Sequence, residues 1–481
     1  MLGKLILMLS YLLISIFLFA TFSADTSVWI SFFVSNLLLF GMFWWHLHQE
    51  KEFSPFISVF LVFSFLFFIL SPVLQIGELN LANGVFITNL KYSQTAIVHT
   101  NVLVIIFNLT FAAAYLYFKK FRTLRVIPVY DQTKYKTLPI LISIITIATV
   151  LVFIASFGFV QEEIRRHSGT PSSASIGMLL LWKKVLFMMP FAGIVLCFQY
   201  FEKRKKLPLN IVIVALLFLI LGAFLLWFKN PLTEKRNALG PIYICIIFLI
   251  APRLLNSNVK MTLFMFFSMI IVFPLSAMLT HVTATFKEIL NKPRVLLDSL
   301  EGYGIGQVFN TLHYDAFINI TATIDYVKYE GFSYGNQLLS GLLFFIPRSL
   351  WEAKPITTGK LVGEHLIEYH GFHYSNLSNP LVSEGYINLG IFGVVIIAIV
   401  LAITCIKFLS WFKSDDYLKK ILALYFSIHL LFLLRGDFAN GFSYYIGIFV
   451  GVYILTRFMQ YIMEQMFLNQ LSWKAKHKQR I

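Results

Sequence analysis

Long runs of apolar residues, separated by short polar segments, dominate this chain. A helix that crosses a bilayer needs about 20 consecutive apolar residues, and about twelve stretches approach that length. Most of the polar segments between them are short, with one exception that begins near residue 281. The pattern therefore predicts an all-α polytopic membrane protein with about 12 transmembrane helices, near residues 5–22, 28–46, 55–75, 95–118, 138–157, 177–200, 209–228, 235–252, 261–280, 383–406, 420–434 and 441–459.

The exception is a loop of about 100 residues, 281–382, which is rich in Gly, Tyr, His and Asn. The apolar run 338–347 is too short to span a bilayer and indicates a segment at the membrane interface. Loops of this length in compact proteins are usually functional. Short amphipathic helices are indicated by apolar residues at helical spacing, namely Ile305, Val308, Phe309 and Leu312. The chain divides into residues 1–280 with nine predicted spans, the loop 281–382 with interfacial helices, and residues 383–481 with three spans and a basic tail.

Composition supports the membrane class, because 58% of the residues are hydrophobic and only 13% are charged. The formal net charge of +16 does not indicate nucleic-acid binding, since membrane proteins concentrate Lys and Arg in cytoplasmic loops. The three cysteines, Cys197, Cys245 and Cys405, lie inside apolar stretches without paired spacing. We interpret them as small buried apolar residues and predict no disulfide.

The distribution of basic residues predicts the orientation of the chain. If the N-terminus is cytoplasmic, the four basic segments all fall on the cytoplasmic side, as the positive-inside rule demands. Both termini are then cytoplasmic, and the long loop lies on the outer face. The basic segments are residues 119–136, 202–206, 407–420 and 474–480.

Cations on the predicted outer face are not expected from this rule, so we consider a functional role for each of them. Arg348 ends the interfacial run, where its guanidinium group can grip phosphate oxygens with two N–H groups. Lys235 and Arg236 stand near the start of a predicted span, with Thr233 as a candidate N-cap. The helix N-terminus and the two cations together would form an anion site. Arg435 is a third outer cation. The alternative is that these are ordinary loop charges or headgroup contacts.

An acidic residue, Glu384, stands in the first turn of the tenth predicted span, with Asn388 one turn later on the same face. A carboxylate at this position is costly unless it is paired, so a functional role is the default, with helix capping as the alternative. Three glycines in the same span, Gly385, Gly390 and Gly393, predict close approach of neighbouring helices.

Three histidines, His365, His370 and His373, precede this span. Their spacing does not match a recognised metal motif, and no cysteine accompanies them, so no metal is predicted. His373 remains a candidate base, and His313 beside Asp315 is a weaker candidate of the same kind. There is no P-loop and no nucleophile elbow, so we expect chemistry without a metal or a cofactor.

Four segments together resemble the bacterial O-antigen (Wzy-type) oligosaccharide repeat unit polymerases: "FIPRSLWEAKP", "SNPLVSEGYINLGIFG", "KRNALGPIY" and "LLRGDF". The resemblance covers roughly residues 225–455, together with the number of spans and the single long outer loop. The related O-antigen ligases usually carry a His-Asn pair before the late span, where this chain has Ser378 and Asn379. This difference argues against a ligase and leaves the base open between Glu384 and His373.

The resemblance implies a polymerase that joins undecaprenyl-diphosphate-linked oligosaccharides at the periplasmic face of the bacterial inner membrane, with the long loop as its periplasmic loop. A chain-length regulator is a further expected partner besides the bilayer. Arg236 and Arg348 are expected to converge on one diphosphate, within reach of Glu384. An O-antigen ligase-like transferase and a lipid-linked glycan transporter or flippase remain alternatives. The assigned residues are Glu384 and His373 as catalytic, Arg236, Arg348 and Arg435 as diphosphate-binding, and Lys235, Lys354, Asn388 and His313 as substrate-binding.

Overall fold

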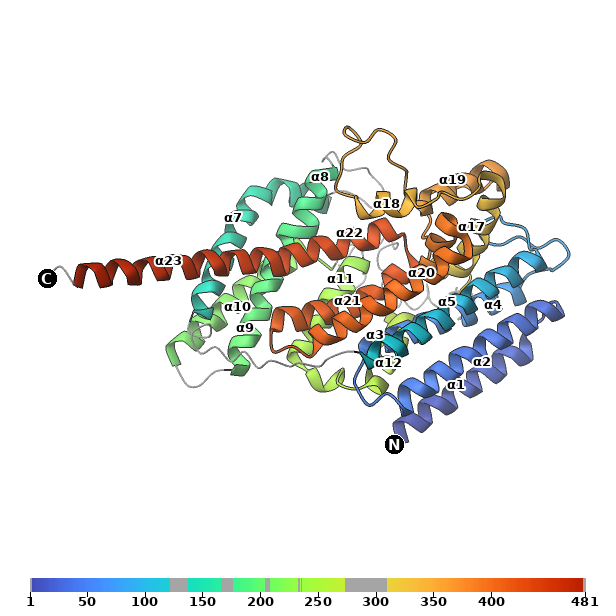
Figure 1. Cartoon of the computed structure of the whole chain (residues 1–481), viewed down its shortest axis with the longest axis horizontal. Helices are drawn as coiled ribbons and strands as arrows, with labels where there is room; N and C mark the ends of the chain where they lie inside the picture. Colours follow the sequence, from blue (N-terminus) through green and yellow to red (C-terminus); the bar gives the residue numbers. More distant parts are fainter. Residues whose placement is uncertain are drawn as a thin grey trace, which may run out of the picture. The chain divides into compact units, whose positions relative to one another are not determined.

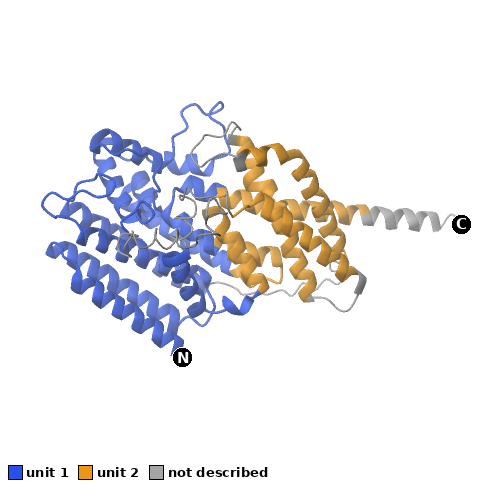
Figure 2. Ribbon diagram, turned by 180° about the vertical axis from the view of Figure 1, so that it is seen from behind, with its two compact units in different colours: residues 1–123, 251–409, 427–443 blue, residues 124–250, 410–426, 444–481 orange. Residues whose placement is uncertain are grey.

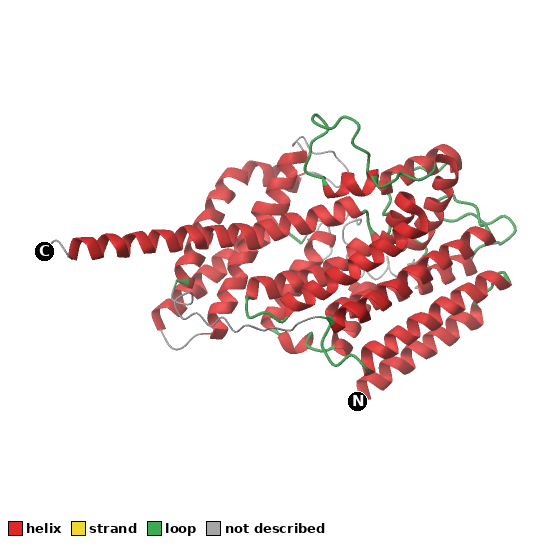
Figure 3. Cartoon of the chain, viewed as in Figure 1, coloured by secondary structure: helices red, strands yellow, loops and turns green. Residues whose placement is uncertain are grey.

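The computed structural model describes residues 2–121, 137–165, 176–203, 208–231, 234, 236–272 and 309–478. Most of these residues are in helices, and loops connect the helices (Figure 3). Within these ranges no β-strand forms, apart from one isolated bridge between Val85 and Lys91. The predicted fold class, an all-α polytopic membrane protein, is confirmed.

Ten helical segments in the described ranges are long and apolar enough to cross a membrane. They comprise α1 (Leu2–Thr21), α2 (Thr26–His48), α3–η1–α4 (Pro55–Gly77), α5 (Gln94–Lys120), α7 (Leu138–Arg165), α8–η2–η3–α9 (Ile176–Lys203), α10 (Pro208–Phe228), α20 (Leu381–Phe412), α21 (Tyr417–Arg435) and α22–η6–α23 (Phe438–Lys478) (Figure 1).

The two remaining predicted spans coincide with shorter apolar helices, α11 (Arg236–Ile250) and α12–η5 (Asn258–Val272). Three further helices occupy the described part of the long loop: α17 (Ala316–Glu330), α18 (Asn336–Leu342) and α19 (Thr358–His370). They confirm short helices in this region. The predicted helical positions Ile305 and Val308 lie outside the described residues.

The chain divides into two compact units (Figure 2). Unit 1 consists of residues 1–123, 251–409 and 427–443, and it contains α17, α18 and α19. Unit 2 consists of residues 124–250, 410–426 and 444–481. The candidate site described below lies entirely within unit 1.

The α3–η1–α4 helix forms the core of unit 1. Every residue of α3 (Pro55–Phe65) is buried, as expected for a helix that is apolar on all sides. Phe60 stacks on Phe111 of α5 with a centroid distance of 4.0 Å. A π-helical turn at Leu66–Leu70 comes directly before Pro72. Proline has no N–H to donate to the carbonyl one turn earlier, and its ring pushes that carbonyl away, so the regular α-helical hydrogen bonds are interrupted here.

The first nine residues of α17, Ala316 to Ile324, are all buried, and the end of the helix is partly exposed. Its polar side chains find partners inside the unit. Thr321 and Thr100 of α5 are joined by a 2.9 Å hydrogen bond between their hydroxyl groups. Asn319 donates to the carbonyl of Ser378 at 2.6 Å. Helix α17 therefore fixes the segment that leads into α20.

Helix α20 is interrupted in its first third. Leu389 (φ −143°, ψ 22°) and Gly390 (φ 61°, ψ −142°) leave the helical region and separate residues 381–388 from 391–412. A Cβ on Gly393 would lie 2.0 Å from the Gly385 carbonyl oxygen, so the two glycines approach each other across the break. The prediction that these glycines admit neighbouring helices is wrong at these two positions, since they accommodate a bend within one helix.

In unit 2, α7, α9 and α10 pack against one another around a cluster of Val160, Phe187 and Phe228. The rings of Phe187 and Phe228 are nearly parallel, with centroids 4.4 Å apart. The cysteines of both units, Cys197, Cys245 and Cys405, are buried and free, as the sequence predicts.

Candidate functional site

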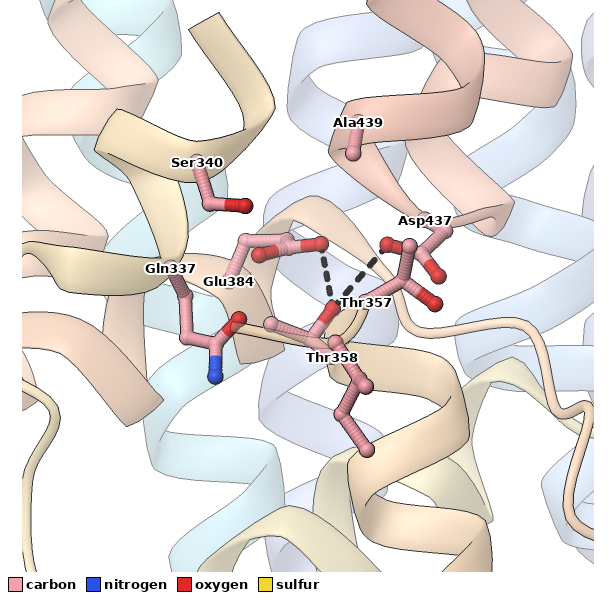
Figure 4. Close-up of a pocket in the computed structure, with 8 residues that line it drawn as sticks. Gln337, Ser340, Thr357, Thr358, Glu384, Asp437 and Ala439 are labelled. Carbon is pink, nitrogen blue, oxygen red and sulfur yellow. Dashed lines mark hydrogen bonds between the residues drawn. The ribbon is translucent and has the colours of Figure 1, made fainter. Parts of the chain in front are cut away.

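A small cavity in unit 1 gathers two carboxylates and several hydroxyl and amide groups (Figure 4). Its empty space is about 180 Å³, open solvent included, but the space in which the centre of a water molecule fits is about 10 Å³, enough for about one water molecule. The cavity therefore admits about one hydroxyl group or water molecule, and a whole oligosaccharide would have to lie outside it. It is lined by Gln337 and Ser340 of α18, Ile356, Thr357 and Thr358 before and at the start of α19, Glu384 of α20, and Asp437 and Ala439 at the start of α22.

Glu384, one of the two predicted catalytic residues, is buried with 2% of its surface exposed. Its Oε1 atom accepts a 2.5 Å hydrogen bond from the Thr358 hydroxyl and a 2.9 Å bond from the Phe438 backbone N–H. Its position in the first turn of α20 places the carboxylate at the positive end of a helix. These contacts offset the cost of burying the carboxylate, and its predicted catalytic role stays a prediction.

Asp437 supplies a second carboxylate on the other side of Thr358, as Figure 4 shows. Its Oδ1 atom lies 3.2 Å from the Thr358 hydroxyl, and its Oδ2 atom accepts from the Gly359 N–H at 3.4 Å. Burial raises the pKa of Asp437, and hydrogen bonds from Thr357 and Thr358 oppose this shift. Two buried carboxylates that flank one hydroxyl group favour sharing a proton.

Sequence reasoning missed Asp437, although it lies in one of the quoted segments, "LLRGDF". The available signal was an acidic residue at a tight connection between two spans, directly after Arg435 and Gly436. Gly359 explains why the Leu377 carbonyl and Asp437 can both approach the start of α19, since a Cβ there would lie 2.1 Å from the Leu377 carbonyl oxygen and 3.2 Å from Oδ2 of Asp437. Only glycine permits this approach, which local sequence does not reveal.

Asn388 holds the break in α20 and does not line the cavity. Its Nδ2 atom donates to the Glu384 carbonyl at 2.8 Å. Its Oδ1 atom accepts from the Ser333 hydroxyl at 3.1 Å and from the Leu338 N–H at 3.3 Å. The predicted substrate-binding residue therefore positions the Glu384 segment against α18.

Arg348 and Lys354 close the loop between α18 and α19. Arg348 donates to the carbonyls of Lys354 and Pro355 at 2.6 and 3.2 Å and is exposed. Burial, followed by the charge of Arg348, lowers the pKa of Lys354. The Lys354 ammonium group donates at 2.9 to 3.0 Å to the carbonyls of Leu343, Phe344 and Ile346. Both cations thus shape the loop next to the cavity helix α18.

Arg435 is held by an ion pair inside unit 1. Its guanidinium group donates to the Leu312 carbonyl at 2.5 Å and to Asp315 at 3.1 Å. Burial raises the pKa of Asp315 and the charge of Arg435 opposes that rise. Arg435 therefore anchors the start of α17, so the contacts do not favour its predicted role at a diphosphate. His313, in the same turn, donates its backbone N–H to the Thr311 hydroxyl oxygen at 3.4 Å.

The remaining predicted residues are not brought to the cavity by any contact in the described part of the chain. His373 is exposed, with its ring 4.9 Å from that of Phe372. Lys235 lies outside the described residues, as does the side chain of Arg236, which begins α11 in unit 2. The convergence of Arg236 and Arg348 on one diphosphate therefore stays a prediction.

A second polar cluster joins α17 to α19. The Nε2 atoms of His365 and His370 lie 3.1 and 2.8 Å from the same Asp325 oxygen, Oδ2. The hydrogen bond from His365 contributes most to lowering the pKa of Asp325, although burial acts in the opposite direction. The sequence drew attention to the histidines but gave no sign of Asp325, which is 40 residues before His365.

No protein-family model, curated protein or solved structure matches this chain. The fold and the candidate site define a multi-pass helical membrane protein with a buried carboxylate pair at one end of its helices.

Proposed function

We propose that this protein is a glycosyltransferase-type polymerase that joins undecaprenyl-diphosphate-linked oligosaccharide repeat units at the periplasmic face of the bacterial inner membrane. The proposal begins from the resemblance of the sequence to O-antigen polymerases. The observation that supports it best is the pair of buried carboxylates, Glu384 and Asp437, bridged by Thr358 in a cavity of hydroxyl-group size.

In the proposed reaction, a hydroxyl group of the acceptor sugar enters the cavity, and the ionised carboxylate pair takes its proton. The hydroxyl oxygen attacks the anomeric carbon of the growing glycan and forms the new glycosidic bond. The bond between that carbon and the diphosphate breaks, and undecaprenyl diphosphate leaves with the electron pair. Thr358 holds the carboxylates in place, and Gln337 and Ser340 supply further polar groups for the sugar.

The leaving diphosphate needs positive charge, and the loop that precedes α19 carries Arg348 and Lys354. Cations that are already fixed in place stabilise a developing anion without the cost of reorganising them. Arg348 is exposed, so its remaining N–H groups are accessible to a phosphate. Arg236 and Lys235 are proposed as further contacts, and the reaction drawn here uses no metal.

Incubation of the purified protein with lipid-linked repeat units tests this proposal directly, because a polymerase produces a ladder of longer glycans. Glu384→Gln keeps the size of the side chain but cannot accept the proton. Since general base catalysis contributes about 10²–10⁴-fold, the ladder should form at least about 100 times more slowly. Glu352→Gln, the same change at an exposed glutamate, is the matched control. Equal ladders from both variants would contradict the assigned role of Glu384.

Two related functions predict other products. A buried carboxylate pair in a membrane protein also suits proton-coupled transport, so a lipid-linked glycan transporter is the second candidate. It would move the substrate across vesicles without forming a glycosidic bond. A ligase-like transferase would give one transfer product on a different acceptor lipid, and no ladder.

A further inference from the structure

The cluster of Asp325, His365 and His370 lies apart from the residues that line the carboxylate cavity. Each side chain offers one ligand atom, and these atoms all lie within 4.8 Å of one another. Among the described residues, this is the one group of three His, Cys, Asp or Glu side chains that meets this criterion. Two imidazoles and a carboxylate are a ligand set that zinc and related ions use, with further positions left for water.

The rings around the cluster hold His365 in a fixed orientation. His365 is 4% exposed, and its ring packs against Tyr326, Tyr329 and Tyr369 with centroid distances of 5.5, 5.4 and 4.8 Å. Its Nε2 atom faces Asp325, while its Nδ1 atom is buried without a hydrogen-bond partner. The Asp325 carboxylate accepts the hydrogen that Nε2 carries, and because no group occupies Nδ1, that hydrogen can move to Nδ1 when Nε2 binds a cation.

We propose that Asp325, His365 and His370 bind one divalent transition-metal ion of the zinc type, and that this ion fastens α19 to α17. The proposal concerns a site separate from the proposed reaction and does not depend on it. In a tetrahedral zinc site with bonds of about 2.1 Å, ligand atoms lie about 3.4 Å apart. The two nitrogen–oxygen distances of 3.1 and 2.8 Å are shorter than that separation by about 0.3 and 0.6 Å, so small movements of the side chains admit an ion.

Binding replaces two hydrogen bonds by metal–ligand bonds and leaves the rest of the cluster unchanged. Each histidine binds as a neutral ring through an Nε2 lone pair, so any hydrogen on that nitrogen moves to Nδ1 or is released to water. The ion, two neutral rings and one carboxylate carry a net charge of about +1. Imidazole nitrogens disfavour calcium and magnesium, which prefer oxygen ligands in larger number.

The position of the cluster gives such an ion a mechanical role. Helix α19 begins with Thr358, which bridges the carboxylates, and His365 lies seven residues further along the same helix. At 1.5 Å per residue the two are separated by about 10 Å along the axis. An ion that fixes α19 to the buried helix α17 would therefore also restrict the position of the Thr358 hydroxyl.

Zinc binding to the full-length protein without a polyhistidine tag tests the proposal. The protein in detergent is incubated with zinc sulfate, passed through a gel-filtration column without metal, and analysed for zinc by mass spectrometry. We expect about one zinc ion per chain for a single site of this kind. Since loss of a mere supporting contact costs about 10–100-fold in affinity, His370→Gln and Asp325→Asn should weaken zinc binding by at least about 100-fold.

His373→Gln is the matched control, because it removes an exposed histidine three residues beyond His370 and should leave zinc binding unchanged. His370 is partly exposed at the end of α19, so His370→Gln should elute as the wild type does even where Asp325→Asn does not fold. Cobalt should bind in place of zinc and give the absorption bands of a tetrahedral site in the wild type and the control alone. Absence of zinc from the wild type, or equal zinc in His370→Gln, overturns the proposal. Both results are independent of glycan polymerisation.

Discussion

The Thr358 hydroxyl has one hydrogen to donate, yet it lies between two buried carboxylates. The shorter contact, 2.5 Å, is to Glu384, and the contact to Asp437 is 3.2 Å. Asp437 also has a hydrogen bond from Thr357 and one from the Gly359 N–H at 3.4 Å. Two buried negative charges beside one hydroxyl group repel each other, so the arrangement favours one proton held by the pair. A single proton can thus be taken up or released at a defined place.

Polymerisation should therefore depend on pH through this pair. Burial raises the pKa of Asp437 above its ordinary value of 3.8, so its ionised form is lost at a higher pH than for an exposed aspartate. The ladder-forming rate should fall as the pH decreases through this raised pKa, and Asp437→Asn should lower the rate and change the pH at which it falls, because Glu384 is then the one remaining carboxylate of the pair. The folded state binds this proton more tightly than the unfolded state, so the contribution of Asp437 to stability increases as the pH falls.

Rates measured at each pH for Glu352→Gln provide the reference, since this exposed residue should leave the profile unchanged. A wild-type rate that does not vary between the ordinary aspartate pKa and neutrality would exclude the carboxylate pair as the base.

The Arg435–Asp315 pair should matter for stability. The Asp315 side chain is 2% exposed and that of Arg435 16%, and removing one partner of a buried pair typically costs about 3–5 kcal/mol. Arg435→Met should lower the apparent unfolding temperature in detergent, because the Asp315 carboxylate is left without its cation. The double variant Arg435→Met/Asp315→Asn should recover part of the loss. Arg348→Met, at an exposed arginine, serves as the control, and an equal effect there would argue against a specific role of the pair.

At the scale of elements, the bend in α20 depends on a glycine. Gly390 has φ 61° and ψ −142°, a combination that costs other residues about 1–3 kcal/mol, and a Cβ there would lie 3.2 Å from the Phe332 ring. Gly390→Ala should therefore destabilise the protein and displace Glu384, lowering both the unfolding temperature and the rate of ladder formation.

The matched variant is Gly158→Ala in α7, where a Cβ meets no atom within 4 Å. In a regular helix this change should be neutral or slightly stabilising, by about 0.5–1 kcal/mol. If both variants behave alike, the bend does not require glycine and our account of it is wrong.

The sequence predicts the membrane-spanning elements well because a span depends on local composition alone. It does not reveal that α17 is buried, since "AFINITATIDYVKYE" contains polar residues whose partners, such as Thr100 and Ser378, come from distant segments. It does not reveal the break in α20 either, because the apolar run continues through Leu389 and Gly390 without a proline.

In the candidate site too, the sequence reveals residues that are unusual in their local context and does not reveal those that depend on distant partners. Glu384 could be found from the sequence, because a carboxylate in the first turn of a span is unusual wherever it occurs. Asp437 and Thr358 could not be recognised from the sequence, because their role depends on a contact between residues that are 79 positions apart in the chain. Arg348 could be recognised as an unusual cation, but its binding to two carbonyl groups of its own loop depends on how that loop closes.

At the scale of the whole molecule, cysteine labelling tests the predicted orientation of the chain. Ser349 lies in the loop before α19 and Asp415 follows the far end of α20, and both are exposed. Ser349→Cys should react with a membrane-impermeant maleimide in intact cells, and Asp415→Cys only after permeabilisation. The three native cysteines are buried and should give little background. The reverse pattern would place the carboxylate cavity in the cytoplasm and remove the basis of the proposed function.

The break in α20 also determines how far the acidic end of this helix must enter the lipid. Residues 391–412 make up about 22 residues, or about 33 Å of helix, which is enough to cross a hydrocarbon layer of about 30 Å. Residues 381–388 are then free to stay in the headgroup layer, so Glu384 avoids an insertion cost of about 2.5–3.5 kcal/mol. Because Thr358, Glu384 and Asp437 are synthesised in that order, the carboxylate pair is complete only after this span has entered the bilayer.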